Sequence, residues 1–476
     1  MIWLYMAIFL VFYVPAARYQ CHMLQLNGYK TKGHLKWLRA NFPGWLYKPY
    51  LRRKAKKPLV YTWRVRRLIL TLAALTAGAL WAACPCMWPA MVLGAPVMLL
   101  AANLANRPWE LAINYSYIWR AKRILKSMPG LTVIGITGSY GKTSVKHYLH
   151  EILSTTFNTL MTPESFNTPM GIVRTVREHL RPFHQFFVCE MGARHVGDIA
   201  ELCRLAQPKH GILTAVGPQH LDTMKTIENI TKTKFALPDS IPADGIVLLN
   251  TDSEIIRQRA ADYKAVTYST RDWDDSDYRA RDIKTGSEGS TFFADMPGGR
   301  SLQCHTAIIG RHNVGNILAA IAMADKLGVP AEAIKKAVAG LKPVPHRLQL
   351  IKRDGLVIID DAFNANESGV AAALETLAMF EGFKIVVTPG LVEMGAAQDE
   401  ANRAFGGKIA QVADCVILMG AKQTQPIMAG LTKAGYPADK VFVAETLEQA
   451  FGRIAALDAG GRQKVALLAN DLPDNF

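Results

Sequence analysis

The sequence predicts an α/β protein with two parallel-sheet domains, preceded by a helical membrane region. Three observations lead to this prediction: a pair of long uncharged stretches near the N-terminus, a strand, glycine-rich turn and helix at residues 131–153, and alternating strands and helices after residue 345. The length of 476 residues suits two or three domains. With 50% hydrophobic and 20% charged residues, the composition excludes a disordered or collagen-like chain.

Positive charge is concentrated in the first 109 residues. The chain has 55 Lys and Arg against 39 Asp and Glu, a net charge of +16. Residues 1–109 hold 15 of the basic residues and no acidic one, because Glu110 is the first. The remaining 367 residues carry 40 basic and 39 acidic groups. Since the basic segment lies between apolar stretches, its charge indicates a membrane surface and not nucleic acid.

Three membrane spans are predicted, at about residues 2–17, 68–84 and 89–105. Residues 68–106 are 39 residues without a charge, about 58 Å as one helix against a hydrocarbon core of about 30 Å. Cys84-Pro85-Cys86 and Pro89 divide this stretch, which favours a hairpin. The alternative for residues 2–17 is a secretory signal peptide, but no basic residue precedes them and 15–17 are a poor cleavage site.

The basic loop 18–67 is expected in the cytoplasm by the positive-inside bias. It either sets topology on anionic lipid or contacts the phosphates of a lipid-linked substrate. Residues 108–127 are expected to form an interfacial connecting helix. Seven scattered cysteines do not indicate a disulfide scaffold. Cys84 and Cys86, at the predicted outer turn, are either small apolar residues of the hairpin or a redox or metal-binding pair.

A phosphate-binding loop is predicted at residues 137–144. The β-branched run 131–136 predicts a strand, and apolar residues at helical spacing follow from Val145. Backbone N–H groups of the glycine-rich turn would face the anion, Lys142 would reach the β- and γ-phosphates, and Thr143 or Ser144 would contact Mg²⁺. The usual pattern has glycine where this chain has Ile136. The alternative is a glycine-rich turn without a ligand.

Two further predicted strands lead to potential metal ligands. The run 186–190 ends at Glu190, and the run 211–216 leads into Gly217-Pro-Gln-His220. Open α/β sheets bind ligands at the carboxyl ends of their strands. Either residue alone is more often a polar loop residue, but with the phosphate loop they predict a Mg²⁺ site.

Seven motifs in this order give residues 128–476 a resemblance to the Mur ligases, the ATP-dependent amide-forming family of bacterial cell-wall synthesis. The motifs are GITGSYGKTS (135–144), TPESFNTPMG (162–171), EMGARH (190–195), GPQHL (217–221), KTK (232–234), GRHNVGN (310–316) and DDAFNAN (360–366). The motifs EMGARH and DDAFNAN resemble those of the MurF type, which joins D-alanyl-D-alanine to a UDP-linked muramoyl tripeptide.

The resemblance implies a role for each matching position. Lys142, Glu190, His220 and Lys234 would be catalytic, and Thr143, Glu190, His220 and a carbamylated Lys234 would hold one or two Mg²⁺ ions; Lys232 is the alternative modified lysine. ATP would contact Gly138, Ser139, Gly141, Lys142, Thr143, Ser144, His312, Asn313, Asn316, Arg347 and Asp361. The acceptor would contact Thr162, Asn167 and Asn364.

The resemblance also implies the reaction and the domains. A carboxylate attacks the γ-phosphate of ATP, and an amine displaces phosphate from the acyl phosphate. Residues 1–127 would be the membrane region, 128–343 the central ATP-binding domain, and 344–476 a Rossmann-like domain closing at the Pro-rich junction 342–346. The protein would be a multi-pass protein of the cell membrane, with its catalytic domains in the bacterial cytoplasm. Its partners would be a muramoyl peptide, an amine, membrane lipid and other cell-wall enzymes.

This sequence departs from the family pattern in two places. Membrane spans occupy the region where soluble members carry a UDP-binding domain, so the acceptor is either UDP-linked or lipid-linked. Residues 388–395 (TPGLVEMG) differ from an expected Gly-Asp-Met pattern, and the Asp-Asn-Pro-Arg signature of diaminopimelate-adding relatives is absent, which leaves the amine open. Two other functions are considered: a non-catalytic ATP-binding membrane scaffold, and a ligase acting on a different acceptor.

Overall fold

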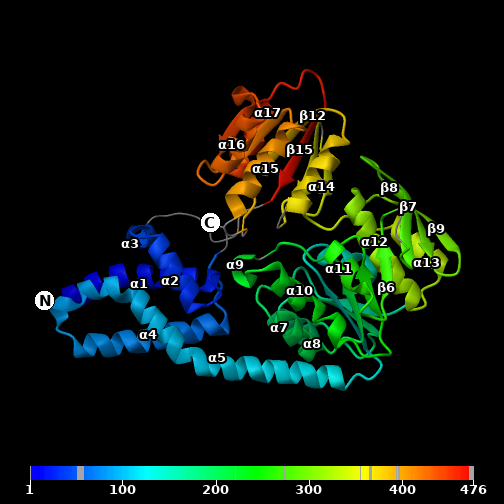
Figure 1. The fold of residues 1–476 in the computed structure, drawn as a ribbon. Coiled ribbons are helices and arrows are strands. Elements are labelled where there is room, and N and C mark those ends of the chain that lie inside the picture. The colour runs from blue at the N-terminus through cyan, green and yellow to red at the C-terminus, as the bar shows by residue number, and fades with distance from the viewer. Residues whose placement is uncertain are drawn as a thin grey trace. The chain divides into compact units, whose positions relative to one another are not determined.

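A computed structural model describes residues 2–50, 58–219, 221–271, 275–353, 355–363, 367–392, 394 and 397–470 (Figure 1). The chain divides into two compact units, one within residues 1–117 and the other within residues 118–471. The first unit is helical, and the second contains two β-sheets with helices around them.

The first unit is built from helices. They are α1 (Ile2–Leu26), α2 (Thr31–Ala40), α3 (Gly44–Tyr47), η1 (Lys48–Tyr50), α4 (Trp63–Ala82), η2 (Pro85–Met87), η3 (Pro89–Gly94) and α5 (Ala95–Lys126). Three helical stretches, 2–26, 63–82 and 90–126, are long and apolar enough to cross a membrane, judged by length and composition alone. The predicted connecting helix at 108–127 is not separate, because α5 runs through Pro108 without a break.

An apolar core joins α1, α4 and α5. It includes Phe9, Leu72 and Leu99, and Tyr13 is hydrogen-bonded to Thr76 at 2.7 Å between the two hydroxyl oxygens. The expected loop 18–67 is largely folded, since α1 continues to Leu26 and α2, α3 and η1 follow. At the turn after α4, Cys84 and Cys86 are exposed and their Sγ atoms lie 3.0 Å apart.

The central sheet of the second unit has nine strands within the described residues, in the order β2-β3-β1-β4-β5-β6-β7-β8-β9. Its strands are β1 (Thr132–Thr137), β2 (Thr159–Met161), β3 (Phe186–Glu190), β4 (His210–Leu213), β5 (Val247–Asn250), β6 (Val266–Ser269), β7 (Tyr278–Gly286), β8 (Gly289–Met296) and β9 (Arg300–Thr306). Strands β1 to β7 pair in parallel with their neighbours in this order, and β7, β8 and β9 form an antiparallel meander.

Helices connect the parallel strands, as parallel pairing requires. They are α6 (Lys142–Leu153), α7 (Pro169–Glu178), α8 (Asp198–Ala206), α9 (Leu221–Met224), α10 (Ile227–Phe235), η4 (Pro238–Ser240) and α11 (Glu254–Ala260). Two more helices, α12 (Arg311–Lys326) and α13 (Ala331–Ala339), follow β9. Helices α6 and α12 contribute to the main apolar cluster through buried residues such as Val145, Leu149 and Leu318. This packing holds the first turn of each helix against the sheet edge.

The second sheet has the order β10-β11-β15-β12-β13-β14, with β10 antiparallel to β11 and the other pairs parallel. Its elements are β10 (Gln349–Arg353), β11 (Leu356–Asp361), α14 (Glu367–Ala378), β12 (Phe383–Thr388), α15 (Gln398–Ala410), β13 (Cys415–Met419), α16 (Gln425–Lys433), η6 (Ala438–Lys440), β14 (Val441–Ala444), α17 (Leu447–Ala456) and β15 (Lys464–Ala469). The predicted fold class, with a Rossmann-like C-terminal domain, is confirmed.

The register of the central sheet brings the predicted site residues to one edge. Strand β1 lies between β3 and β4, with Ile136 opposite Glu190 on one side and Ile212 on the other. All three strands run in the same direction, so the loops that follow them meet at their carboxyl ends. The site described next is built on this edge.

Candidate active site

The loop after β1 has a backbone that requires glycine at two positions. Gly138 and Gly141 have φ angles of 154° and 82°. A Cβ atom at 138 would lie 2.1 Å from Thr214 Oγ1, and one at 141 would lie 2.5 Å from Asn316 Oδ1. Helix α6 begins directly after Gly141 and has no side-chain cap. Its first N–H groups, which have no partner within the helix, point toward the loop and can bind an anion.

Lys142 folds back over this loop. Its Nζ donates to the carbonyl oxygens of Gly138 at 2.6 Å and Ser139 at 3.2 Å. Burial lowers the pKa of Lys142 to about 8; Glu190 opposes this shift, and Arg347 adds to it. The ammonium group therefore lies where a phosphate bound in the loop would need a counter-charge.

The hydroxyl groups of the phosphate loop differ in whether they already form hydrogen bonds within the protein. Ser139 Oγ both donates to Gly217 O and accepts from Gly217 N, at 3.0 Å each, and Ser139 N donates to Ala215 O at 2.8 Å. Ser139 thus joins the phosphate loop to the loop after β4. The buried hydroxyl of Ser144 is hydrogen-bonded to Tyr148. Of the two predicted Mg²⁺ contacts, Thr143 is therefore better placed than Ser144.

Glu190, at the end of β3, is held by several polar groups. Asn167 Nδ2 donates to its Oε1 at 3.0 Å, and its own backbone N–H donates to Thr162 Oγ1 at 3.1 Å. Lys146 Nζ lies 3.1 Å from Oε2, and both side chains are almost fully buried. Burial alone would raise the pKa of Glu190, but the charges of Lys146 and Lys142 outweigh it and hold the pKa below its ordinary value. Glu190 is therefore an anion at neutral pH.

Lys234, on α10, is buried with 2% of its surface exposed, whereas Lys232 is exposed. Burial, together with the charge of Lys142, lowers the pKa of Lys234 well below its ordinary value, and Asp198 and Glu190 oppose the shift. This lowered pKa favours the unprotonated amine. Of the two lysines considered from the sequence, Lys234 has the environment that a modified lysine requires.

The described residues do not by themselves complete a metal site. No group of three or more His, Cys, Asp or Glu side chains suited to a metal gathers among them. His220 and Asn364, both predicted as site residues, lie outside the described residues. Within the described part, Glu190 Oε2 is buried, and Lys146 Nζ lies 3.1 Å from it. A buried, ionised carboxylate beside the phosphate loop fits a Mg²⁺ ion, which prefers oxygen ligands.

A cavity of about 870 Å³ opens beside the phosphate loop. His312 and Asn316, on the first turns of α12, line it. The imidazole is open to the cavity, yet the surrounding protein lowers its pKa to about 4 by burial, with Arg347 adding to the shift. Asn313 is buried behind them and donates to Ile309 O at 3.0 Å. The structure thus brings His312 and Asn316 to the cavity, and Asn313 supports the helix start.

Arg347 and Asp361 flank the site from the junction and from β11. Burial lowers the pKa of Arg347, opposed by Asp361 and Glu190. Burial also raises the pKa of Asp361 to about 6, and the charge of Arg347 opposes this. Asp361 accepts a hydrogen bond from Leu348 N at 3.2 Å, and the guanidinium of Arg347 lies 4.7 Å from the centre of the Phe363 ring.

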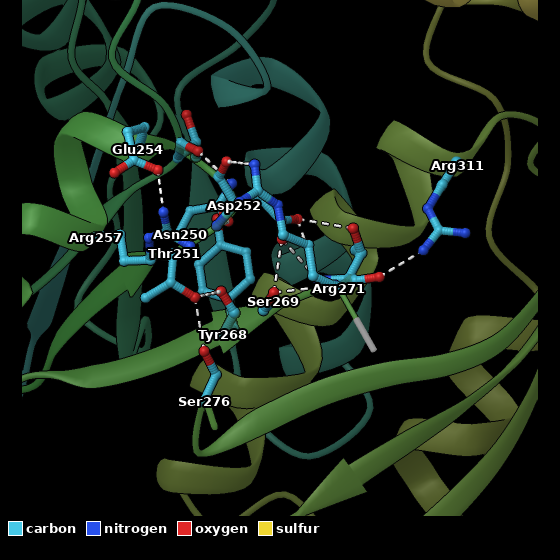
Figure 2. A network of polar contacts seen from close by, with 12 residues as sticks. Asn250, Thr251, Asp252, Glu254, Arg257, Tyr268, Ser269, Arg271, Ser276 and Arg311 are labelled. Atoms are coloured by element: carbon cyan, nitrogen blue, oxygen red, sulfur yellow. Dashed lines mark hydrogen bonds and ion pairs between the residues drawn. The ribbon is translucent and has the colours of Figure 1, made fainter. Parts of the chain in front are cut away.

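A polar network around Asp252 borders the same cavity. Its residues were not among those predicted from the sequence. Figure 2 shows Asp252 facing Ser269 and Arg271. Its carboxylate accepts hydrogen bonds from Ser269 Oγ at 2.7 Å, Thr270 Oγ1 at 2.8 Å, and Thr270 N at 3.0 and 3.1 Å. Thr270 O in turn accepts a hydrogen bond from Arg311 at 2.6 Å. Asp252 therefore connects the ends of β5 and β6 to the first residue of α12.

The network continues to the phosphate loop. Asn250 Oδ1 accepts from Asp252 N at 3.0 Å, and Asn250 Nδ2 donates to Thr214 O at 2.7 Å. Thr214 Oγ1 donates to Tyr140 O in the phosphate loop. The sequence signal for this network was an Asn-Thr-Asp run after an apolar strand, which resembles many surface turns. Lys146 was missed for a similar reason, because lysine on a helix is usually solvated.

Two family models match the chain. The Mur ligase middle domain matches residues 136–324, and the Mur ligase glutamate ligase domain matches residues 346–469.

Proteins with related sequences carry one name. The UDP-N-acetylmuramoyl-tripeptide–D-alanyl-D-alanine ligase of Escherichia coli (strain K12) is 32% identical over 317 residues, which cover 65% of this chain and 68% of that protein. The enzyme of the same name from Bacillus subtilis (strain 168) is 32% identical over 292 residues, covering 61% of this chain and 62% of that protein. The chain thus spans about two thirds of the length of these relatives.

A solved structure has a similar fold over most of the chain. MurF from Acinetobacter baumannii superimposes with a TM-score of 0.68 at 26% sequence identity, covering 76% of this chain and 78% of that one.

Proposed function

The chain belongs to the Mur ligase family, and from this premise we propose that it is an ATP-dependent, ADP-forming ligase of the MurF type that forms an amide bond on a muramoyl peptide. The observation that carries this proposal is the position of Lys142, in a glycine-built phosphate loop, beside the buried anion Glu190. The cavity next to this loop has a volume suited to a nucleotide.

The proposed nucleotide contacts follow from the geometry. The N–H groups at the start of α6 and the Lys142 ammonium bind the β- and γ-phosphates of ATP. His312 and Asn316 contact the base or ribose in the cavity, and Arg347 adds positive charge near the γ-phosphate, opposite Asp361. Gly138 and Gly141 keep the loop close to the phosphates, while Ser139, Ser144 and Asn313 maintain its shape.

Glu190, Thr143 and His220 would hold Mg²⁺. When bound, the ion neutralises charge on the transferring phosphoryl group. Thr162 and Asn167, which hold Glu190 in place, lie in the stretch that we assign to the acceptor, together with Asn364.

The reaction proceeds in two steps. The acceptor carboxylate attacks the γ-phosphate and gives an acyl phosphate and ADP, while Lys142 and Arg347 stabilise the charge on the phosphoryl oxygens. The amine then attacks the acyl carbon, the C–O bond to phosphate breaks, and phosphate leaves with the bonding electrons. Both steps depend on positioned reactants and on exclusion of water.

Lys234 is proposed to react with CO₂ to give a carbamate. The reaction needs an unprotonated amine, and the lowered pKa of the buried Lys234 supplies one. The carbamate anion would face Lys142 and could take part in holding a second Mg²⁺. We expect a carbamate signal in ¹³C NMR of protein equilibrated with ¹³C-bicarbonate, absent from Lys234→Met; an identical signal in that variant would contradict the assignment.

The substrates are proposed from the names of the relatives. These enzymes join D-alanyl-D-alanine to a UDP-N-acetylmuramoyl tripeptide, and we expect the same amine here. The acceptor is either UDP-linked or carried on a lipid, because the three long apolar helices would place the enzyme in the cell membrane with its catalytic domains in the cytoplasm. Membrane lipid and other cell-wall enzymes are its expected partners.

The test uses the full chain in lipid nanodiscs with ATP, Mg²⁺ and D-alanyl-D-alanine. ADP release is measured with the UDP-linked tripeptide and, separately, with its lipid-linked counterpart. We expect release with at least one acceptor, reduced at least about hundredfold in Lys142→Ala and unchanged in Lys433→Ala, a substitution at an exposed lysine of α16. ATP binding without release for either acceptor would contradict the proposed function.

A further inference from the structure

The segment between α1 and α4 packs against α1 and is hydrogen-bonded to it close to the start of α4. Gln25 Nε2 donates to Val60 O at 2.8 Å, and Val60 N donates back to Gln25 Oε1 at 3.0 Å. Within the segment, the buried His34 is hydrogen-bonded to Gln20 at 3.1 Å between Nε2 and Oε1. The ring of Trp37 lies 5.9 Å from that of Tyr19, centroid to centroid. One face of α2 therefore packs on the last third of α1.

The opposite face of α2 is basic. Lys32, Lys36 and Arg39 follow at intervals of four and three residues, which places them on one stripe of the helix. All three are exposed, and none forms an ion pair within the described residues. The chain has no acidic residue before Glu110, and Glu110 forms an ion pair with Arg67, at 2.7 Å between Oε1 and Nη2. Within residues 2–50 and 58–117, the stripe is thus a positive surface without an acidic partner.

The next part of the segment, residues 41–50, lies beside the apolar part of α1. Tyr50 OH donates to Phe12 O at 2.9 Å, and the two rings meet edge to face at 5.7 Å between centroids. Phe12 precedes Arg18, the first charged residue of α1, by six residues or about 9 Å. Interfacial elements bury their apolar side about 5–10 Å into the boundary between headgroups and acyl chains. With Arg18 at the level of the headgroups, Tyr50 would lie within this range.

Exposed aromatic side chains accompany the same stretch. Phe42 and Tyr47 are 68% and 54% exposed. Tyrosine rings such as that of Tyr47 are favoured at the membrane interface, where one end is apolar and the other is wet. Residues 31–50 thus combine a basic face with exposed aromatic side chains, which is the composition of a segment that lies in a membrane surface.

We propose that residues 31–50 form an interfacial anchor that binds anionic phospholipid headgroups through Lys32, Lys36 and Arg39. The proposal rests on the membrane placement proposed above, and of the two roles considered for the loop 18–67 it favours contact with anionic lipid. The three charges extend over about 10 Å of helix, so they face several headgroups and do not converge on one phosphate. Bulk anionic lipid is therefore the ligand class, in preference to a single lipid-linked diphosphate.

The test measures which lipids stay with the full chain. The protein is placed in nanodiscs of equal phosphatidylglycerol and phosphatidylcholine, extracted in mild detergent, and its retained lipids are counted by native mass spectrometry. We expect at least threefold enrichment of phosphatidylglycerol in the wild type. The triple variant Lys32→Gln, Lys36→Gln, Arg39→Gln should retain the two lipids in nearly equal numbers.

Control variants separate this proposal from its alternatives. A control triple variant carries Lys335→Gln, Lys336→Gln and Lys433→Gln. It removes three exposed charges from the other unit and should keep the wild-type enrichment of phosphatidylglycerol. Equal enrichment in both triple variants, or none in the wild type, would overturn the proposal, as would retention of added polyprenyl diphosphate without phospholipid enrichment. Lipid counting needs no turnover, so a failure of ligase activity would leave this result readable on its own.

Discussion

Lys146 and Glu190 form the most deeply buried charge pair around the phosphate loop. Lys146 lies one helical turn after Lys142 on α6, and its Nζ is 3.1 Å from Glu190 Oε2. Pairing keeps the carboxylate ionised inside the protein, where an isolated charge would be costly. Since a carboxylate offers about four lone-pair sites, Glu190 can bind a metal ion while it remains paired with Lys146.

Removing Lys146 should therefore make stability depend on Mg²⁺. We expect Lys146→Met to lose about 3–5 kcal/mol, because it removes the ion-pair partner of the buried Glu190 carboxylate. Thermal unfolding with increasing Mg²⁺ should recover more stability in this variant than in the wild type. The double variant Lys146→Met, Glu190→Gln should be less destabilised than the single one. Equal loss in both variants would show that the charge of Glu190 is not the cause.

Asp361 should lower the stability of the folded protein above pH 6. Its pKa is raised to about 6 by burial, against about 3.9 in an unfolded chain. The folded state therefore binds the proton more tightly, and stability falls as pH rises from about 4 to 6. Asp361→Asn should be more stable than the wild type at pH 8, by at most about 3 kcal/mol, with no difference near pH 4. Equal melting temperatures at pH 8 would contradict this.

At the scale of elements, the positions of strands and loops could be predicted from the sequence, but the contacts between these elements could not. The run 131–136 and the glycines that follow specify a strand and a turn locally, so β1 and the phosphate loop were predicted within one residue. Asp252 and Thr270 are 18 residues apart and meet because β5 and β6 pair in parallel. Nothing local to either residue encodes that pairing. The path of residues 41–50 along α1 depends on tertiary contacts in the same way.

The Asp252 network should tune nucleotide binding more than the chemical step. Asp252→Asn retains the size of the side chain but removes part of its acceptor capacity toward Thr270, which supports Arg311 and the start of α12. We expect the KM for ATP to rise about tenfold to a hundredfold, with kcat changed less than threefold. Steady-state kinetics at saturating acceptor and amine measure both.

Asp277→Asn is the matched control. Asp277 accepts a backbone N–H and a hydroxyl hydrogen bond from Thr267, at the other end of β6. The two aspartates thus hold the same strand in the same way, at opposite ends. A similar rise in KM for ATP in both variants would indicate general loosening of β6 and not a specific effect at the cavity.

At the scale of the whole molecule, the chain joins a helical unit rich in positive charge to a nearly neutral ligase unit. From the sequence, the charge distribution and the apolar runs led us to expect a membrane region at residues 1–127 followed by catalytic domains. The ligase fold was predicted from motifs, most of which follow a strand. The sequence could not predict which residues support the motifs, because Lys146, Asn250 and Asp252 acquire their roles through neighbours that are distant in the chain.

The central claim is that this site activates a carboxylate by phosphorylation before an amide forms. The most direct measurement uses an acceptor peptide whose carboxylate carries ¹⁸O in both oxygens. If the acceptor oxygen attacks the γ-phosphate and later leaves with it, each amide formed releases one phosphate that contains one ¹⁸O atom. Mass spectrometry of the released phosphate should show this one-to-one ratio. Unlabelled phosphate, released without amide, would show that ATP is hydrolysed by water and would contradict the account.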